Sequence, residues 1–228
     1  MKIYLKKIIK NLTPFGIVKF IERNNFYKKY GYTFKKKRKD FLKLNKLNIC
    51  SGAVFLDDYI NLDISPNSDL VLDLEKNNLP FQGERFEVII FMSAVNYFEK
   101  KRAIKILEET YRVLKKGGVF RISTQCLDKI INYYIKRDHT FFNQKQKDGT
   151  VRFPGKTNAE KLLNWFYGFE TIEGHKTKYI YNFDILSNIL REIGFKNIKN
   201  KKFLESRLLD IKDIDNRNDQ CFIIECEK

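Results

Sequence analysis

The sequence predicts an α/β fold whose core is a mostly parallel sheet. Residues 86–92 are apolar except for Glu87, which is typical of a strand covered on both faces. Apolar residues recur at helical spacing over residues 101–116 and 183–193, so helices alternate with the strands. At 228 residues the chain is long enough for one such domain and a terminal appendage, and it can bury a core without disulfides.

The first half of the sheet follows from short apolar segments. Strands are predicted at residues 44–50, 59–64, 69–73 and 86–92. The first strand runs into the small-residue turn at residues 50–52, and the second ends near Asp63. Only six residues, 53–58, separate the turn from the second strand. A helical crossover normally takes a dozen residues or more, so this connection is expected to be a loop.

The second half combines helices with three further strands. The predicted elements are a helix at 101–116, a strand at 119–124, a helix at 183–193 and strands at 196–203 and 221–226. Gly117 and Gly118 are expected to end the first helix and Gly194 the second, because glycine accepts the left-handed conformation that closes a helix. A turn without a helix joins the last two strands, which predicts a closing antiparallel hairpin.

Residues 125–180 form an insertion that is dense in aromatic side chains, among them Trp165. Aromatic density outside the strand pattern suits a substrate pocket or a lid. The alternative is an ordinary helix pair whose aromatic side chains pack in a core, and for each aromatic residue taken singly this alternative is favoured.

Positive charge is concentrated at the N-terminus. The net charge is +16, and residues 1–46 hold 15 Lys or Arg against two acids, which gives +13, whereas residues 47–228 hold 29 against 26, which gives +3. Residues 1–43 are therefore predicted to be a basic helical extension of a nearly neutral domain at residues 44–228. Such an extension suggests an anionic partner, namely a phosphorylated small molecule, an anionic lipid surface or nucleic acid. A solvated face produced by biased composition explains it equally well.

Cysteine and histidine usage bounds the compartment and the metal chemistry. The four cysteines form no CxxC pair and the chain has two histidines, so a structural zinc site is not expected. No apolar run is long enough to span a bilayer, and no signal peptide is recognisable. We expect a protein of the reducing cytoplasm, with a peripheral contact to the inner face of the membrane as an option for the N-terminus.

Three segments resemble the class I S-adenosylmethionine (SAM) dependent methyltransferases, in particular a short bacterial branch. They are residues 47–52 (LNICSG), residues 59–64 (YINLDI) and residues 111–118 (YRVLKKGG), the last nearly identical to the family's Tyr-Arg-Val-Leu-Lys-Pro-Gly-Gly. The sequence departs from the family at Cys50, where glycine is usual, and at Ser51, where cysteine is usual. The resemblance implies a Rossmann-like sheet of seven strands with helices on both faces, and SAM as cofactor.

The resemblance also implies which residues bind the cofactor. Asp63 takes the ribose hydroxyls, and Asp73 with Leu74 borders the adenine. The other expected cofactor contacts are Asn48, Cys50, Ser51, Gly52, Ala53, Ile64 and Ser93. Alternatives remain open: Asp63 could instead cap a turn, and Asp69 or Glu75 could fill the place of Asp73.

Methyl transfer from a sulfonium is an in-line displacement, so the enzyme mainly supplies proximity and alignment. A base is needed only when the acceptor must lose a proton, and the candidates are His175, His139 and Asp138. For an already ionised acceptor, cationic side chains bind and orient it instead. The expected substrate contacts are Tyr27, Tyr30, Lys36, Arg38, Tyr97 and Trp165.

The function expected from these features is O-methylation of a small anionic metabolite or a sugar precursor, phosphorylated, phosphoramidate-like or nucleotide-linked. Surface-polysaccharide biosynthesis is the pathway that the resemblance implies. Two alternatives remain: a nucleic-acid methyltransferase, although the Asn/Asp-Pro-Pro-Tyr motif is missing, and a degenerate methyltransferase fold that only binds a ligand or a partner. A dinucleotide-binding dehydrogenase is disfavoured, because no GxGxxG follows the first strand.

Overall fold

The computed structural model describes residues 43–65, 67–145, 149–167 and 176–228. The predicted N-terminal extension therefore lies outside the described residues, apart from Lys43. The same holds for four expected substrate contacts and one candidate base, namely Tyr27, Tyr30, Lys36, Arg38 and His175.

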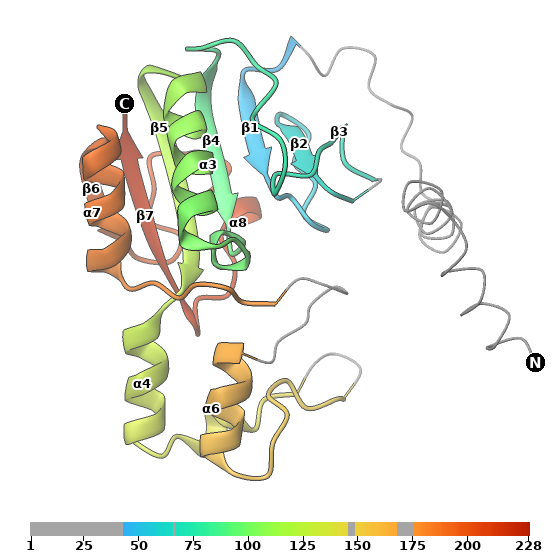
Figure 1. Ribbon diagram of the computed structural model, residues 1–228, viewed down its shortest axis with the longest axis vertical. Helices are drawn as coiled ribbons and strands as arrows, with labels where there is room; N and C mark the ends of the chain where they lie inside the picture. The colour runs from blue at the N-terminus through green and yellow to red at the C-terminus, as the bar shows by residue number, and fades with distance from the viewer. Residues whose placement is uncertain (1–42, 66, 146–148, 168–175) are drawn as a thin grey trace, which may run out of the picture.

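Seven strands form one mixed sheet in the order β3-β2-β1-β4-β5-β7-β6 (Figure 1). They are β1 (Lys46–Ile49), β2 (Ile60–Asp63), β3 (Leu70–Val71), β4 (Phe86–Met92), β5 (Leu114–Gln125), β6 (Lys196–Lys201) and β7 (Cys221–Glu227). Strands β1 to β5 pair in parallel, and β7 runs antiparallel to both β5 and β6. The predicted seven-stranded, mostly parallel sheet with an antiparallel end is confirmed. The β1–β2 connection contains no helix, as its length requires.

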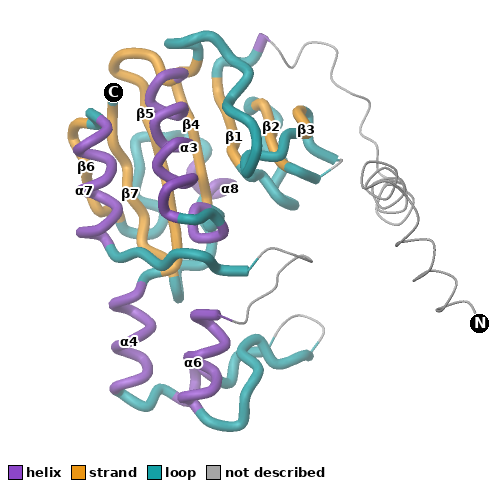
Figure 2. Tube along the Cα trace, in the orientation of Figure 1, coloured by secondary structure: helices purple, strands orange, loops and turns teal. Residues whose placement is uncertain are grey.

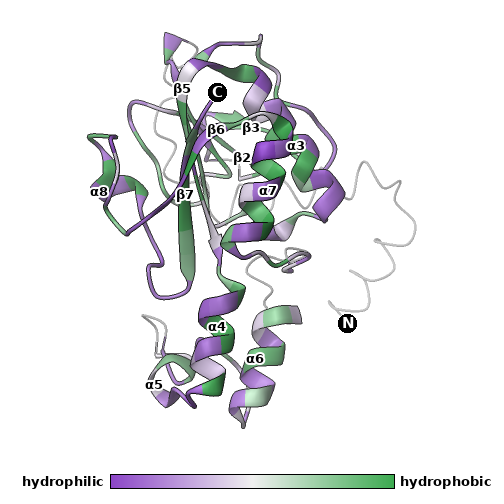
Figure 3. Ribbon diagram, turned by 90° about the vertical axis from the view of Figure 1, so that its left-hand side faces the viewer, coloured by the Kyte–Doolittle hydropathy of each residue, from purple (hydrophilic) through white to green (hydrophobic). Residues whose placement is uncertain are grey.

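Two helices cover one face of the sheet, α3 (Lys100–Val113) and α7 (Phe183–Ile193), and they lie side by side in Figures 2 and 3. Their apolar stripes pack with the inward-facing strand residues into the main core. The Asn182 side chain accepts a hydrogen bond from Ile185 N at 2.9 Å and begins α7. Gly194, at φ 114°, ends it, as predicted.

The Gly117–Gly118 pair has a different role from the one predicted. Helix α3 already ends at Val113, and Leu114 belongs to β5, where it pairs with Phe86. Gly117, at φ 72°, lies within β5, and a Cβ atom on Gly118 would come within 2.8 Å of the Lys115 carbonyl oxygen. The two glycines therefore allow a tight bend inside the strand segment, which the pattern of apolar residues did not reveal.

Figure 3 shows the connection between β6 and β7 on the opposite face of the sheet. This connection, residues 202–220, was expected to be a turn, but it contains the short helix α8 (Ile211–Ile214). A second cluster forms here from Leu56, Tyr59, Val88, Ile90 and Ile214. Residues of the helix-free β1–β2 loop thus meet α8, which covers sheet surface near that loop.

The insertion after β5 folds into a helical unit, which we define as residues 127–145 and 149–167. It contains α4 (Leu127–Ile135), α5 (His139–Phe142) and α6 (Asn158–Tyr167). The unit lies beyond the carboxyl ends of β4 and β5 (Figure 1). In the described part of the chain, no helix is both long and apolar enough to cross a membrane.

Candidate functional site

The turn that follows β1 brings three small residues to the carboxyl edge of the sheet. Cys50 and Gly52 both adopt left-handed backbone conformations, with φ of 53° and 55°. A Cβ atom on Gly52 would meet no atom within 4 Å, so the backbone is open to an approaching ligand there. The hydroxyl of Ser51 is buried and has no hydrogen-bond partner among the described residues.

Asp63 ends β2 directly beside this turn. One carboxylate oxygen, Oδ2, accepts a hydrogen bond from Gly52 N at 2.9 Å, and the other, Oδ1, accepts one from Ser65 N at 2.7 Å. A carboxylate offers about four lone-pair sites, so these two bonds fix its orientation and leave acceptor capacity for hydroxyl groups. The side chain of the next residue, Ile64, is 45% exposed and offers an apolar surface beside the carboxylate.

These features fit an adenosyl cofactor. Asp63 would bind the ribose hydroxyls, and Ile64 would contact the adenine. The open turn at Gly52 would hold the methionine part of the cofactor, with the unpaired Ser51 hydroxyl as a further hydrogen-bond donor. Cys50 is the residue that fits least, because its side chain occupies a left-handed position that glycine adopts without strain. Burial, together with the nearby charge of Asp63, raises the pKa of the Cys50 thiol and keeps it protonated.

Asn48 has a structural role in the β1–β2 connection. Its amide nitrogen donates to the carbonyl oxygen of Val54 at 3.0 Å and to Asn61 Oδ1 at 3.1 Å. Asn61, which is fully buried, also bonds both backbone groups of Leu56. Its own backbone and side-chain nitrogens donate to Asp69 Oδ2 at 2.9 and 2.8 Å. The side-chain amides of Asn48 and Asn61 thus stabilise the helix-free loop between β1 and β2.

The remaining residues expected to bind cofactor lie at the margin of this site. Asp73 accepts a hydrogen bond from Glu75 N at 3.0 Å and pairs with Lys76, so its carboxylate stabilises its own turn. Leu74 is buried in the main core, and Ala53 is exposed beside Gly52. Asp69, one alternative to Asp73, is committed to Asn61.

Ser93, another residue expected to bind the cofactor, follows β4 in a left-handed conformation, φ 56°. Its hydroxyl donates to Asn216 Oδ1 at 2.9 Å, and its backbone nitrogen donates to Ser123 O at 2.9 Å. Cys221 Sγ lies 3.6 Å from the Ser93 hydroxyl, and burial raises the pKa of this thiol to about 11. Sequence reasoning missed Asn216, because nothing in its surrounding residues distinguishes it from an ordinary polar turn.

Asn96, in the 3₁₀ helix η2 (Val95–Tyr97), lies in a buried polar network next to Ser93. Its amide nitrogen lies 3.3 Å from Gln125 Oε1 and 3.4 Å from Thr177 Oγ1. Its carbonyl oxygen accepts hydrogen bonds from the backbone nitrogens of residues 178 and 179. Tyr97, an expected substrate contact, is half-buried against the main core.

The candidate bases in the helical unit do not lie at the sheet edge. Asp138 caps α5 by accepting a hydrogen bond from Phe141 N at 2.9 Å, and the exposed His139 begins that helix. Both follow the distal end of α4, whose nine residues span about 13 Å, and Figure 3 shows α5 beside its lower half. The structure thus separates these two residues from Asp63 and Ser93.

Trp165 is a core residue of the helical unit in place of the expected substrate contact. It is fully buried in a cluster with Ile130, Phe141, Phe142 and Phe153. Stacking between Phe141 and Tyr133, at a centroid distance of 4.2 Å, extends this cluster. The aromatic residues of the insertion therefore mostly pack on one another, which agrees with the second interpretation of the sequence.

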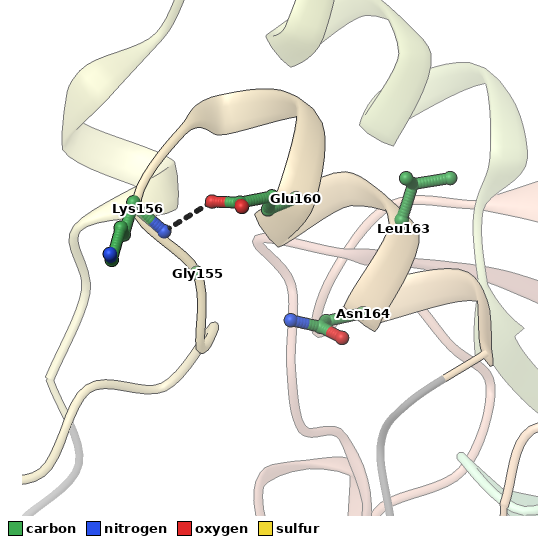
Figure 4. A pocket seen from close by; sticks show the side chains of 5 residues that line it. All are labelled: Gly155, Lys156, Glu160, Leu163 and Asn164. Carbon is green, nitrogen blue, oxygen red and sulfur yellow. Dashed lines mark hydrogen bonds between the residues drawn. The ribbon is translucent and has the colours of Figure 1, made fainter.

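An open surface depression on the helical unit is lined by Gly155, Lys156, Glu160, Leu163 and Asn164 (Figure 4). The Glu160 carboxylate accepts hydrogen bonds from the backbone nitrogens of Lys156 and Thr157, and Glu160 N donates to the Thr157 hydroxyl. This arrangement is a capping box at the start of α6. The carboxylate is occupied by capping, and the depression is separate from the sheet edge.

Comparisons with known proteins find a family model and solved structures that are similar to this chain. Residues 50–122 match the family model of the methyltransferase domain. This range contains Gly52, Asp63 and Ser93. Among solved structures, a SAM-dependent methyltransferase of Archaeoglobus fulgidus shares 15% identity, with 99% of both chains covered and a TM-score of 0.48. Another SAM-dependent methyltransferase, from Thermotoga maritima, shares 16% identity over 92% of this chain and 95% of that one, with a TM-score of 0.49. No curated protein matches the chain.

Proposed function

We propose that this chain, a class I SAM-dependent methyltransferase by its domain family and its fold, methylates an oxygen of a small anionic metabolite or sugar precursor. The observation that carries the proposal is the Asp63 carboxylate, which two backbone nitrogens hold beside the open turn at Gly52. An acid at the tip of the second strand accepts hydrogen bonds from ribose hydroxyls.

The side chains beyond β4 suit an acceptor that carries hydroxyl groups. They include the half-buried hydroxyl of Ser93 and amide of Asn216, which are uncharged and able to bind hydroxyls. Such groups orient an acceptor without deprotonating it. An acceptor oxygen that is already ionised needs no base, whereas a hydroxyl acceptor would pass its proton to a base such as His175, which lies outside the described residues.

The chemistry places few demands on the protein. When bound, the cofactor supplies a methyl group on a sulfonium centre. With the cofactor held by Asp63 and the open turn at Gly52, an acceptor oxygen bound beyond β4 would take up the methyl group. The residues of this chain contribute alignment, and alignment alone can supply a large share of the rate enhancement.

Calorimetric titration with SAM and with S-adenosylhomocysteine tests the proposal. We expect both ligands to bind the full chain, and Asp63→Ala to weaken both by roughly 10- to 100-fold, the equivalent of a hydrogen bond to a charged group. Asp213→Ala, which removes an exposed carboxylate on α8, serves as the control and is expected to leave both affinities unchanged. An unchanged affinity in Asp63→Ala would refute the role of Asp63.

Radiolabelled SAM then identifies the acceptor class. We expect methyl uptake onto phosphorylated sugars or nucleotide sugars and none onto nucleic acid. Uptake onto nucleic acid alone would favour the nucleic-acid alternative. The surface-polysaccharide pathway, the cytoplasmic location and a peripheral membrane contact by the basic N-terminus are parts of the proposal that rest on the sequence.

One observation favours a second candidate function, a methyltransferase fold that binds a partner or another ligand without catalysis. Cys50 keeps a side chain in a left-handed turn position that suits glycine, where it narrows the space for the methionine part of the cofactor. The same titration separates the two functions. If neither SAM nor S-adenosylhomocysteine binds the full chain, the non-catalytic function becomes the better one.

A further inference from the structure

The helical unit has a core of its own. Its buried side chains, Ile130, Phe141, Phe142, Phe153 and Trp165, form a cluster separate from the main core of the sheet. A displacement of the unit as a rigid body would therefore leave the packing around the sheet largely intact. Ile180, which lies outside the unit, packs against this cluster, and polar contacts add to the attachment.

Most of these polar contacts converge on one short segment, residues 215–221, which we call the docking segment. Arg152 Nη1 lies 2.6 Å from Asp219 Oδ2, and the Tyr133 hydroxyl donates to the Asp219 carbonyl oxygen at 3.0 Å. Lys129 Nζ donates to the carbonyl oxygens of Asn218 and Cys221, at 3.0 and 2.6 Å. Groups from α4 and from the loop before α6 thus meet on the same few residues.

The single tryptophan of the chain also contacts the docking segment. Trp165 Nε1 donates to Gln220 Oε1 at 3.3 Å. The edge of the indole that carries Nε1 lies against Gln220, so release of the unit would expose this edge to a quencher while the rest of the ring stays in the unit's core.

The other end of the docking segment is fixed to the sheet. The Arg121 guanidinium, fully buried in β5, donates to both carboxylate oxygens of Asp215 at 2.9 and 2.7 Å and to Glu225 Oε2 at 3.1 Å. Asn216 accepts the hydrogen bond from Ser93 on the acceptor side of the edge. Because the docking segment is fixed to the sheet in this way, it holds the helical unit in a defined position relative to the sheet edge.

Contacts of a second kind lie at the base of α4. Leu127 N donates to the Tyr181 carbonyl oxygen at 2.9 Å, and Asn182 Nδ2 lies 3.5 Å from Asp128 Oδ1. These contacts lie where the chain enters the unit and would persist while the rest of it moves. The helical unit could therefore rotate about the base of α4, and its contacts to the docking segment would have to break for it to do so.

We propose that the docking segment latches the helical unit over the acceptor side of the site, with Arg152 and Lys129 as the positioning residues that close the latch. The unit lies beyond the carboxyl ends of β4 and β5, where ligands of open α/β sheets bind, so its release would open that side to the acceptor (Figure 1). That this release admits a methyl acceptor rests on the proposed function. The Arg152–Asp219 pair is partly exposed, so it is weak enough to open reversibly.

Trp165 fluorescence in the full chain tests the latch. We expect the double variant Arg152→Gln/Lys129→Gln to raise the acrylamide quenching constant of Trp165 about twofold or more over the parent chain. The matched control is Lys136→Gln/Lys156→Gln, which removes the same charge from exposed residues of the unit that make no hydrogen bond to the docking segment. It should leave quenching unchanged. Arg152→Lys with Lys129 intact should restore protection, because it keeps a cation opposite Asp219.

Equal quenching in the double variant and its control would overturn the latch. If the double variant fails to fold, as judged by circular dichroism, Asp219→Asn replaces it with the same expectation. S-adenosylhomocysteine affinity is measured alongside and should change less than twofold, because Asp63 and Gly52 lie in the other half of the edge. If the parent chain does not bind S-adenosylhomocysteine, the proposed function is refuted, whereas the fluorescence test of the latch still stands.

Discussion

The two halves of the sheet's carboxyl edge differ in how far apart along the chain their hydrogen-bonded residues lie. In the half at the ends of β1 and β2, which we call the cofactor half because we propose that the cofactor binds there, Gly52 bonds Asp63 eleven residues away, and Asn48 bonds Asn61 thirteen residues away. In the half at the ends of β4 and β5, which we call the acceptor half because we propose that the acceptor binds there, Ser93 bonds Asn216, which is 123 residues away. The first half is a local structure that can form from one short stretch of chain. The second exists only once distant segments have met.

The difference shows how the fold compensates for a missing element. The cofactor half lacks a helix between β1 and β2, and side chains of the acceptor half's long β6–β7 connection supply part of the cover, with Ile214 packing beside Tyr59. Lys46 Nζ also lies 3.3 Å from Asp210 Oδ2 across this boundary. The local half can therefore form its own hydrogen bonds, but its outer face depends on the distant half.

The largest effect is expected in the acceptor half, from Arg121→Met. The variant leaves the buried Asp215 carboxylate without its cation, and breaking a buried pair in this way costs about 3–5 kcal/mol of unfolding free energy. Urea denaturation measures it. Lys115→Met, which breaks an exposed pair with Glu87, is the control and should cost less than about 1 kcal/mol. A comparable loss in both variants would contradict the view that the docking segment depends on this pair.

The next effect is expected in the cofactor half, from Asn61→Ala. The substitution leaves buried backbone groups of Leu56 unpaired, and each unsatisfied group costs about 1–3 kcal/mol. Because the loop adjoins Gly52 and Asp63, we also expect weaker binding of S-adenosylhomocysteine by calorimetry. Asn188→Ala, on the exposed side of α7, should change neither quantity. A loss of stability without any loss of affinity would show that the turn forms independently of the loop.

The smallest effect on stability is expected from Cys50→Gly. Relief of left-handed strain, roughly 1 kcal/mol, is offset by lost packing and by the greater chain entropy of glycine, so the free energy of unfolding should change by less than about 1 kcal/mol. Affinity for SAM should rise by up to about tenfold, the equivalent of roughly 1.4 kcal/mol. An unchanged affinity would mean that the Cys50 side chain points away from the cofactor.

Much of the cofactor half was predictable because its physics is local. Strand β4, next to that half, also has the predicted bounds, since an almost entirely apolar run is typical of a strand covered on both faces. The loop between β1 and β2 followed from its length alone. Asp63 was singled out because it ends the second strand beside a small-residue turn. The structure places it against Gly52, and it also caps the turn at Ser65, the alternative role.

The acceptor half was predictable only in outline, because its contacts join residues far apart along the chain. Asn216 and Asp219 look like turn residues until the fold sets them against Ser93 and Arg152. The aromatic residues of the insertion could line a pocket or fill a core, and only packing decided for Trp165 that it is core. The sequence by itself determined the strands and the short loop through periodicity and chain length, and it singled out Asp63 as a candidate cofactor ligand. Tertiary structure decided the acceptor side, because long-range pairing leaves no local pattern.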